Sequence, residues 1–348
     1  MEKSLLNNTH LVSEQCLRDF FHINEVSLLN KKEELAFNNP VTNQIIAIGG
    51  ANVDRKFSIE GEAKLGTSNP AKVSESVGGV ARNIAENLGR LGNRIALITT
   101  IGNDYDSVLI EQFSKNYMCL DLIKKMENEK TGSYSAILDQ FGELIIAMAN
   151  MAIYKQLSPE LLKTHAYILQ QAKCILIDLN CPVETVEYAK NFASLYSIPF
   201  VIIPVSSPKM VNMPSELDGV SYLICNRDEA GTYLNMELNC FSQYEKAIKK
   251  LQMKGAKTVL LTLGENGVMV GHDGQLKHYK AVRASHIIDV TGTGDAFVSA
   301  FLHGVLNNHT LEQAVKFGLV SSSKTLQSDN TVRQDLTVEN LLSWMEIE

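Results

Sequence analysis

Short apolar runs that end in glycine or polar residues recur along the chain. The first occupies residues 44–50, where four apolar residues precede Gly49 and Gly50. Runs of this length and ending are typical of buried strands in a parallel sheet. Four further runs of the same kind lie at 174–180, 200–205, 222–226 and 257–264. The pattern predicts a core sheet whose strands are covered on both faces.

Segments with helical periodicity separate these strands. In residues 83–92, Ile84, Leu88 and Leu91 fall on one helical face, and Gly92 suits the position after the last turn. We also expect a strand at 94–101, helices at 106–115 and 184–196, a helix start at 158–160, a hairpin near 272–275 and a capping box at 310–313. Repeated β–α alternation predicts an α/β fold with a mainly parallel, doubly wound sheet and helices on both faces.

Two regions alternate like strands but contain no helical segment. They are residues 56–77, with Val73, Glu75 and Val77, and residues 131–150, with a turn near 140–143. A small sheet inserted into the α/β domain explains both regions. Because such inserts commonly close over sites, we expect a β-sheet lid.

Residues 1–42 differ from the remainder of the chain. They mix Asn, Glu and Lys with scattered apolar positions and close with Pro40. We expect a small helical extension or a poorly ordered tail, without a function that its sequence reveals. One α/β domain is expected over residues 43–348.

Composition excludes several classes of protein. The 348 residues are 45% apolar and 20% charged, with a net charge of −7, so a nucleic-acid surface is not expected. Six scattered cysteines without zinc spacing suggest reduced residues of a cytoplasmic protein. No run approaches the roughly 18 apolar residues of a membrane span. Neither secretion nor membrane insertion is expected.

Residues 289–297 carry the strongest chemical signal. Gly292 and Gly294 flank Thr293 just before an apolar run that predicts a helix. Backbone N–H groups at such a turn form an anion hole, which the helix dipole strengthens. Asp295 would repel an anion unless it has another role, and accepting a proton from a substrate hydroxyl is one. The alternative is an ordinary helix cap after a Gly-x-Gly turn.

Polar residues or glycines follow most of the predicted strands, and in a parallel sheet these strand ends meet along one edge. They are Asn52, Asp54, Asn180, Asn226 with Glu229, and Thr262 with Gly264 and Gly267. Asn52 and Asp54 are candidate substrate contacts, or alternatively stabilise a turn with their side chains. The chain contains neither a P-loop motif nor a complete Gly-x-Gly-x-x-Gly after the first strand. Together the residues predict one site for a hydroxyl-bearing substrate and a polyphosphate.

The chain resembles the ribokinase-like (PfkB) carbohydrate kinases over residues 44–348. The first family signature is matched by Gly78, Gly79, Asn83, Ala85, Gly92 and Gly102. The second is matched by residues 289–292, Gly294, Asp295, Ser299 and Ala300. Thr293 stands where the family usually has alanine, and a small effect is expected because this position contributes mainly backbone. Stretches at 67–70, 78–85 and 142–144 look like one group of nucleoside kinases rather than ribokinase or fructokinase.

The resemblance implies a ribokinase-like fold and ATP-dependent phosphorylation of a sugar 5′-hydroxyl. Asp295 would be the general base, and the amides of Gly292, Thr293 and Gly294 would hold the transferred phosphoryl group. The implied substrate residues are Asn52, Asp54, Gly78, Gly79, Asn83, Asn180, Arg82, and Asn69 once the lid closes. Arg82 could instead be a surface arginine at a helix start.

The resemblance also implies cofactors and a partner. Asn226 and Glu229 would organise Mg²⁺ and phosphate, while Thr262, Gly264 and Gly267 would border ATP. Asp289 and Thr291 would supply oxygens to a monovalent cation, usually K⁺. A homodimer formed through the lid is possible in this family.

Two alternatives to this function remain open. One is another sugar or nucleoside kinase of the same fold. The other is a catalytically silent ligand-binding protein, against which the intact Gly294 and Asp295 argue.

Overall fold

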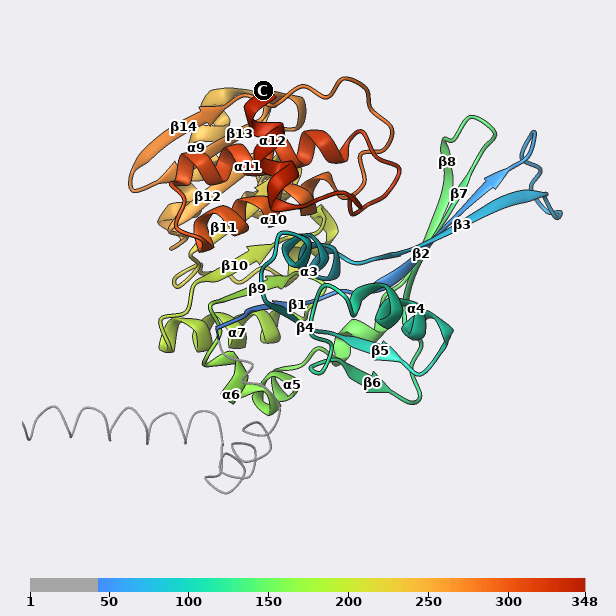
Figure 1. Ribbon diagram of the computed structural model, residues 1–348, viewed down its shortest axis with the longest axis horizontal. Coiled ribbons are helices and arrows are strands. Elements are labelled where there is room, and N and C mark those ends of the chain that lie inside the picture. Colours follow the sequence, from blue (N-terminus) through green and yellow to red (C-terminus); the bar gives the residue numbers. More distant parts are fainter. Residues whose placement is uncertain (1–42, 348) are drawn as a thin grey trace, which may run out of the picture.

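The computed structural model describes residues 43–347, so the predictions for residues 1–42 lie outside the described residues. Eight strands of the described chain form one large sheet (Figure 1). In spatial order they are β14 (Gln275–Tyr279), β13 (Val268–His272), β12 (Thr258–Thr262), β11 (Tyr222–Asn226), β10 (Phe200–Ile203), β9 (Cys174–Asp178), β1 (Ile45–Ile48) and β4 (Ile95–Ile98).

The six strands from β12 to β4 run parallel to one another, β13 pairs antiparallel with β12, and β14 pairs antiparallel with β13. The carboxyl ends of β1, β9, β11 and β12 therefore meet at one edge of the sheet. Of the polar residues that sequence analysis singled out, Asn180, Asn226 and Thr262 lie at this edge. The hairpin predicted near 272–275 is the β13–β14 connection.

Helices cover both faces of this sheet, as predicted. One face carries α5 (Pro159–Thr164), α6 (Ala166–Leu169), α7 (Val183–Leu195), α8 (Arg227–Leu234) and α9 (Phe241–Met253). The other carries α3 (Val80–Arg90), α4 (Tyr105–Ser114), α10 (Thr293–Leu306) and α11 (Leu311–Thr325). The final helix is α12 (Val338–Ile347), and short 3₁₀ turns lie at Ala152–Gln156, Ser207–Asn212 and Gly264–Asn266.

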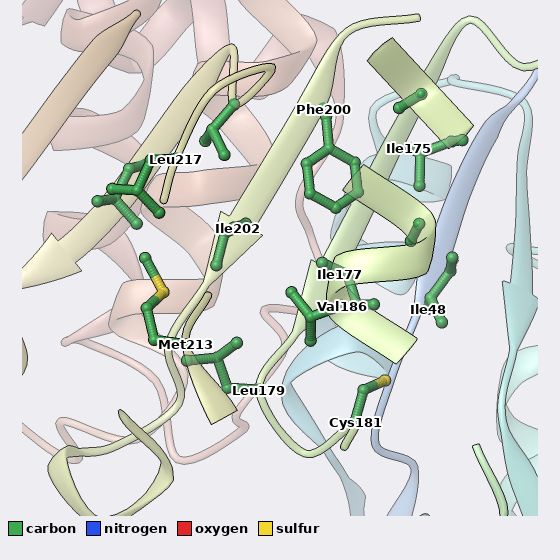
Figure 2. Close-up of a cluster of buried hydrophobic side chains, with 14 of the residues drawn as sticks. Ile48, Ile175, Ile177, Leu179, Cys181, Val186, Phe200, Ile202, Met213 and Leu217 are labelled. Carbon is green, nitrogen blue, oxygen red and sulfur yellow. The ribbon is translucent and has the colours of Figure 1, made fainter. Parts of the chain in front are cut away.

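Strand residues alternate between the two apolar layers. Ile175 and Ile177 of β9 face the α7 side, where Val186 packs against them (Figure 2). Cys174 and Leu176 of the same strand face α3 and α10. Each fully buried Ile or Leu contributes about 1.5–3 kcal/mol to folding. This double layer holds the strand ends of the site in fixed positions.

A second sheet of four strands forms the predicted lid. Its order is β3 (Ala71–Gly78), β2 (Asn52–Ile59), β7 (Gly132–Leu138) and β8 (Leu144–Asn150). Figure 1 shows these strands extending away from the large sheet. The lid begins directly after β1, because only three residues, Gly49 to Ala51, separate β1 from β2. Its base is therefore tied to the edge that carries the site.

Three local predictions need correction. The helix expected from Asn83 begins at Val80, because Gly79 is its N-cap and the Gly79 carbonyl accepts the Asn83 N–H. The strand expected at 94–101 breaks at Thr99 into β4 and β5 (Thr100–Gly102), and β5 pairs with β6 (Lys124–Met126) in a separate sheet. Asn52 and Asp54 lie within β2, so the turn interpretation for them is wrong.

Other local predictions are confirmed. Thr310 caps α11 in a capping box with Gln313. Cys174, Cys181 and Cys225 are buried free thiols, as expected for reduced core residues, whereas Cys240 is exposed. In the described part of the chain, every helix is too short or too polar to span a lipid bilayer.

Candidate active site

The first turn of α10 holds the predicted anion hole. Gly292 is the N-cap, with a positive φ of 79°, and no side chain caps the helix there. A Cβ at this position would lie 2.1 Å from the carbonyl oxygen of Thr331, so only glycine fits. Gly294, one residue into the helix, faces open space, since a Cβ there would meet nothing within 4 Å. The turn is therefore open toward an anion.

Asp295 is the third residue of α10, and its half-buried carboxylate is held by α3. The side-chain amide of Asn83 donates to Oδ2 of Asp295 over 2.9 Å. Asp295 is not the cap of α10, because Gly292 takes that position. Burial raises the pKa of Asp295 to about 7, with Asp178 and Asp54 adding to the rise and the Asn83 hydrogen bond opposing it. A carboxylate that ionises near neutral pH suits general base chemistry.

Asn52 and Asp54 lie on β2, two residues apart and therefore on the same face of the lid. The amide of Asn52 donates to Oδ1 of Asp54 over 2.5 Å. Burial raises the pKa of Asp54 to about 6, although the Asn52 hydrogen bond and the charges of Lys56 and Arg82 lower it. Gly78 lies against this carboxylate, since a Cβ there would be 2.1 Å from Oδ2 of Asp54. The pair presents oxygen and amide groups suited to sugar hydroxyls.

Gly79 and Arg82 belong to the start of α3. Gly79 has φ 98°, and a Cβ there would be 2.4 Å from the carbonyl oxygen of Gly50, so glycine permits β1 and α3 to approach closely. Arg82 is only 2% exposed, so the surface interpretation is wrong. Its guanidinium forms an ion pair with Glu86 and donates to Ser114 over 3.1 Å. These contacts support a structural role, and substrate contact by Arg82 stays a prediction.

Asp178 is a site residue that sequence analysis missed. It is fully buried at the end of β9, where its carboxylate accepts the N–H groups of Gly50 at 2.9 Å, Ala81 at 3.0 Å and Asn180 at 2.9 Å. Asn180 also donates its side-chain amide over 3.2 Å. Burial raises the pKa of Asp178, which these hydrogen bonds oppose. Asp178 thus ties the strand ends to the start of α3, and an acidic residue closing an apolar run was the available signal.

Asn226 and Glu229 lie at the start of α8 and form a reciprocal capping box. The Asn226 side chain accepts the Glu229 N–H at 2.9 Å, and the Glu229 carboxylate accepts the Asn226 N–H at 2.8 Å. Glu229 is buried, and burial raises its pKa. In this structure the Asn-x-x-Glu motif primarily sets the conformation at the end of β11.

Thr262, Gly264 and Gly267 follow at the end of β12. Thr262 is the register partner of Asn226 on the neighbouring strand. Gly267 has φ 87°, and a Cβ there would lie 2.0 Å from the Tyr279 carbonyl oxygen. Asn226, Thr262, Gly264 and Gly267 therefore lie at the same sheet edge as Asn180. Asn180 follows β9, whereas the other four residues follow or end β11 and β12, two and three strands further along the sheet.

Asp289 and Thr291 lie in the turn before α10. The Thr291 N–H and hydroxyl both donate to Oδ1 of Asp289, over 2.8 and 2.7 Å. Lys56 of β2 donates to the other carboxylate oxygen over 2.8 Å. Burial raises the pKa of Asp289, but the bonds from Lys56 and Thr291 outweigh it and lower the pKa to about 2.

Asn69 is the predicted site residue that the structure keeps apart from the others. It lies in the loop between β2 and β3 at the outer end of the lid. Its side chain accepts the Lys64 N–H at 2.8 Å and donates to the carbonyls of Lys64 and Thr67. In this conformation Asn69 shapes its own loop.

The described residues, 43–347, contain no group of three or more His, Cys, Asp or Glu side chains arranged to hold a metal ion. Mg²⁺ in kinases commonly keeps several waters and uses one or two carboxylates together with substrate phosphates. The Asn226 side-chain oxygen and one Glu229 carboxylate oxygen already accept backbone N–H groups. These residues therefore fit a role in which water molecules lie between them and the Mg²⁺ ion.

Comparison with known proteins shows the family and the fold of the chain. The profile of the pfkB family carbohydrate kinases matches residues 42–337. Pseudouridine kinase of Escherichia coli (strain K12) is 29% identical over 87% of this chain and 96% of its own length. Guanosine-inosine kinase of Exiguobacterium acetylicum is 26% identical over 82% of this chain and 95% of its own length.

A solved structure shares the whole fold. Arabidopsis thaliana ribokinase, complexed with ribose and ATP, matches with a TM-score of 0.79 at 20% identity, over 88% of this chain and 100% of that chain. This likeness confirms the predicted ribokinase-like fold. Since the family profile spans most of the chain, the protein belongs to the pfkB family of carbohydrate kinases and is a sugar or nucleoside kinase of that family.

Proposed function

We propose that this kinase transfers a phosphoryl group from ATP to the 5′-hydroxyl of pseudouridine, which yields pseudouridine 5′-phosphate and ADP. The observation that carries the proposal is the position of Asp295. Its carboxylate, with a pKa of about 7, lies at an uncapped helix start and is oriented by Asn83. A base and an anion hole within one helical turn suit phosphoryl transfer to a hydroxyl.

In the proposed reaction, Asp295 takes the proton of the 5′-hydroxyl while that oxygen attacks the terminal phosphorus of ATP. A P–O bond to the sugar forms as the bond from this phosphorus to ADP breaks. The amides of Gly292, Thr293 and Gly294 stabilise the charge on the transferred group. The proton remains on Asp295 until solvent removes it.

Two observations support pseudouridine as the substrate. Asn52 and Asp54 present an amide and a carboxylate suited to ribosyl hydroxyls, and the Asp54 carboxylate packs directly against Gly78. The relative in Escherichia coli is named pseudouridine kinase. The stretches at 67–70, 78–85 and 142–144 of this chain resemble pseudouridine kinase sequences. Asn83 and Asn180 complete the proposed sugar side of the site.

ATP is the proposed donor because the residues at the ends of β11 and β12 fit the nucleotide side. Gly264 leaves open space at its position, and Thr262 lies beside Asn226 on the adjacent strand. Mg²⁺ bound to the phosphates would neutralise charge on the transferred group. We propose that Asn226 and Glu229 position the water around that ion.

K⁺ fits the structure less well. The carboxylate that would bind it, Asp289, already has both oxygens occupied, one by Thr291 and the other by Lys56. The proposed reaction therefore contains no step that uses a monovalent cation.

The lid suggests a homodimer. β8 is an edge strand with all seven of its residues exposed, and Leu144, Ile146 and Met148 are each more than half exposed. Exposed apolar edge strands favour pairing with another chain. A second copy that covers β8 would complete the lid, and light scattering coupled to gel filtration tests this homodimer.

A cytoplasmic location remains a prediction from composition.

A substrate panel tests the proposed function. ADP release would be measured with ATP and Mg²⁺ against pseudouridine, uridine, guanosine, inosine, ribose and fructose. Selective turnover of pseudouridine supports the proposal. Selective turnover of guanosine or inosine would transfer the assignment to the activity named for the Exiguobacterium relative. Absence of turnover with every acceptor would instead favour a silent ligand-binding protein.

A further inference from the structure

An ion pair joins the lid to the turn that precedes the anion hole. Nζ of Lys56 on β2 lies 2.8 Å from Oδ2 of Asp289, although the two residues are 233 positions apart. The Lys56 side chain is 43% exposed and that of Asp289 is 23% exposed, so the pair is partly shielded from solvent. Partial shielding makes such a pair stronger than one on the open surface.

Asp289 organises the turn that leads into α10. Its Oδ1 accepts the N–H and hydroxyl of Thr291, and the Thr293 hydroxyl donates to the Val290 carbonyl over 2.8 Å. Gly292, the N-cap of α10, is three residues from Asp289. The position of the Asp289 carboxylate therefore influences where the amides of the anion hole point.

Lys56 is held at this place by the strand that carries it. Alternation along β2 puts Lys56 on the same face as Asn52 and Asp54. On the opposite face, Arg55 forms an ion pair with Asp106 of α4 over 2.5 Å and another with Glu75 of β3 over 2.8 Å. The base of the lid is thus fixed from both sides, and Lys56 reaches Asp289 from a defined position.

The residues at Asp289 disagree with a bound monovalent cation. Such a cation would need the carboxylate as an oxygen ligand, and an ammonium group already occupies one oxygen. We infer that the Lys56 ammonium takes the place of the monovalent cation, holding the Asp289 turn and making phosphoryl transfer by this protein independent of K⁺. Lys56 is then a positioning residue. The inference rests on the proposed function.

Kinase activity in different salts provides the first test. Activity would be compared in K⁺ and in tetramethylammonium at equal ionic strength, and we expect wild type to change less than about twofold. Lys56→Met should lose about tenfold in tetramethylammonium and recover most of this loss in K⁺. Lys56→Arg keeps a cation and should remain independent of K⁺. The matched control is Lys72→Met, which removes another lid lysine paired with a carboxylate, that of Glu60.

Thermal unfolding provides a second readout that does not need activity. K⁺ should raise the melting temperature of Lys56→Met but not that of wild type or Lys72→Met. Strong dependence of wild-type activity on K⁺ would overturn the inference while leaving the kinase function intact. Loss of activity in Lys56→Met without any K⁺ effect on rate or melting would also overturn it. If wild type phosphorylates no acceptor, the proposed function fails, and the melting experiment alone decides the role of Lys56.

Discussion

Asn83 and Asp295 are 212 residues apart in the sequence, yet the side-chain amide of Asn83 donates a 2.9 Å hydrogen bond to the carboxylate of Asp295. The contact exists because α3 and α10 pack together on one face of the large sheet. Each helix begins at a glycine of positive φ, Gly79 in α3 and Gly292 in α10. The two signature motifs of the chain therefore lie side by side, at the candidate site.

Removing the Asn83 amide should shift the pH dependence of the reaction. The hydrogen bond lowers the pKa of Asp295, so Asn83→Ala should raise that pKa above its present value of about 7. A base must be ionised to act, so the acidic limb of kcat/KM should move upward by about half to one pH unit. Rate profiles between pH 5 and 9 measure the shift. The control is Asn87→Ala, one turn further along α3, and an equal shift in this control would refute the role of the Asn83 contact.

Asp295→Asn should stabilise the protein above neutral pH. The folded-state pKa of about 7 lies above the ordinary carboxyl value of 3.8, so the stability that Asp295 contributes is present at low pH and lost as the pH rises through 7. Asparagine does not ionise, so the variant should melt about 2–4 °C above wild type near pH 8. The difference should vanish near pH 4. Melting curves of wild type and variant near pH 8 and near pH 4 test this expectation. A variant that melts at a lower temperature than wild type near pH 8 contradicts the raised pKa of Asp295.

Gly292 and Gly294 should respond differently to alanine. Gly292→Ala places a Cβ 2.1 Å from the Thr331 carbonyl oxygen at a positive φ, which should cost about 1–3 kcal/mol of unfolding free energy. Gly294→Ala meets no atom within 4 Å and should keep its stability. Its methyl group would enter the space proposed for the phosphoryl group, so turnover should fall. Chemical denaturation and rate measurements on both variants separate strain from obstruction, and full activity in Gly294→Ala would place the anion elsewhere.

Asp178→Ala should destabilise the strand ends that carry the candidate site, and it also releases the proposed substrate residue Asn180. It leaves the N–H groups of Gly50, Ala81 and Asn180 without their acceptor, and each unsatisfied buried group costs about 1–3 kcal/mol. Asp178→Asn retains one carbonyl oxygen and should lose less stability. Denaturant unfolding of the two variants checks the order. Equal stability of Asp178→Ala and wild type would show that solvent replaces these contacts.

Sequence reasoning identified the sheet, the lid and both signature motifs because these depend on local patterns. Buried strands read as apolar runs, and the anion-hole glycines meet steric demands that act within a few residues. Asp178 was not identified as a candidate site residue because a carboxylate at the end of an apolar run looks like part of the strand. Its structural role depends on the hydrogen bonds that it accepts from the N–H groups of Gly50 and Ala81, which are distant from it in the sequence.

Long-range pairs were equally hidden. The Lys56–Asp289 contact joins residues that no periodicity connects. Arg82 pairs with Glu86 one turn along the same helix, but the burial of its side chain, which rules out the alternative of a surface arginine, depends on the elements packed around it. Asn52 and Asp54 were placed just past β1, but they are already paired with β3 and β7. These features depend on tertiary packing, which local preferences do not encode.

The most direct test of the central proposal follows the phosphorus itself. ³¹P NMR would monitor ATP, Mg²⁺ and pseudouridine with wild type and with Asp295→Asn. We predict that wild type forms equal amounts of ADP and pseudouridine 5′-phosphate, and that the variant is slower by about 10²–10⁴-fold while remaining folded. Undiminished product formation by Asp295→Asn, or no sugar phosphate with wild type, would contradict the proposal.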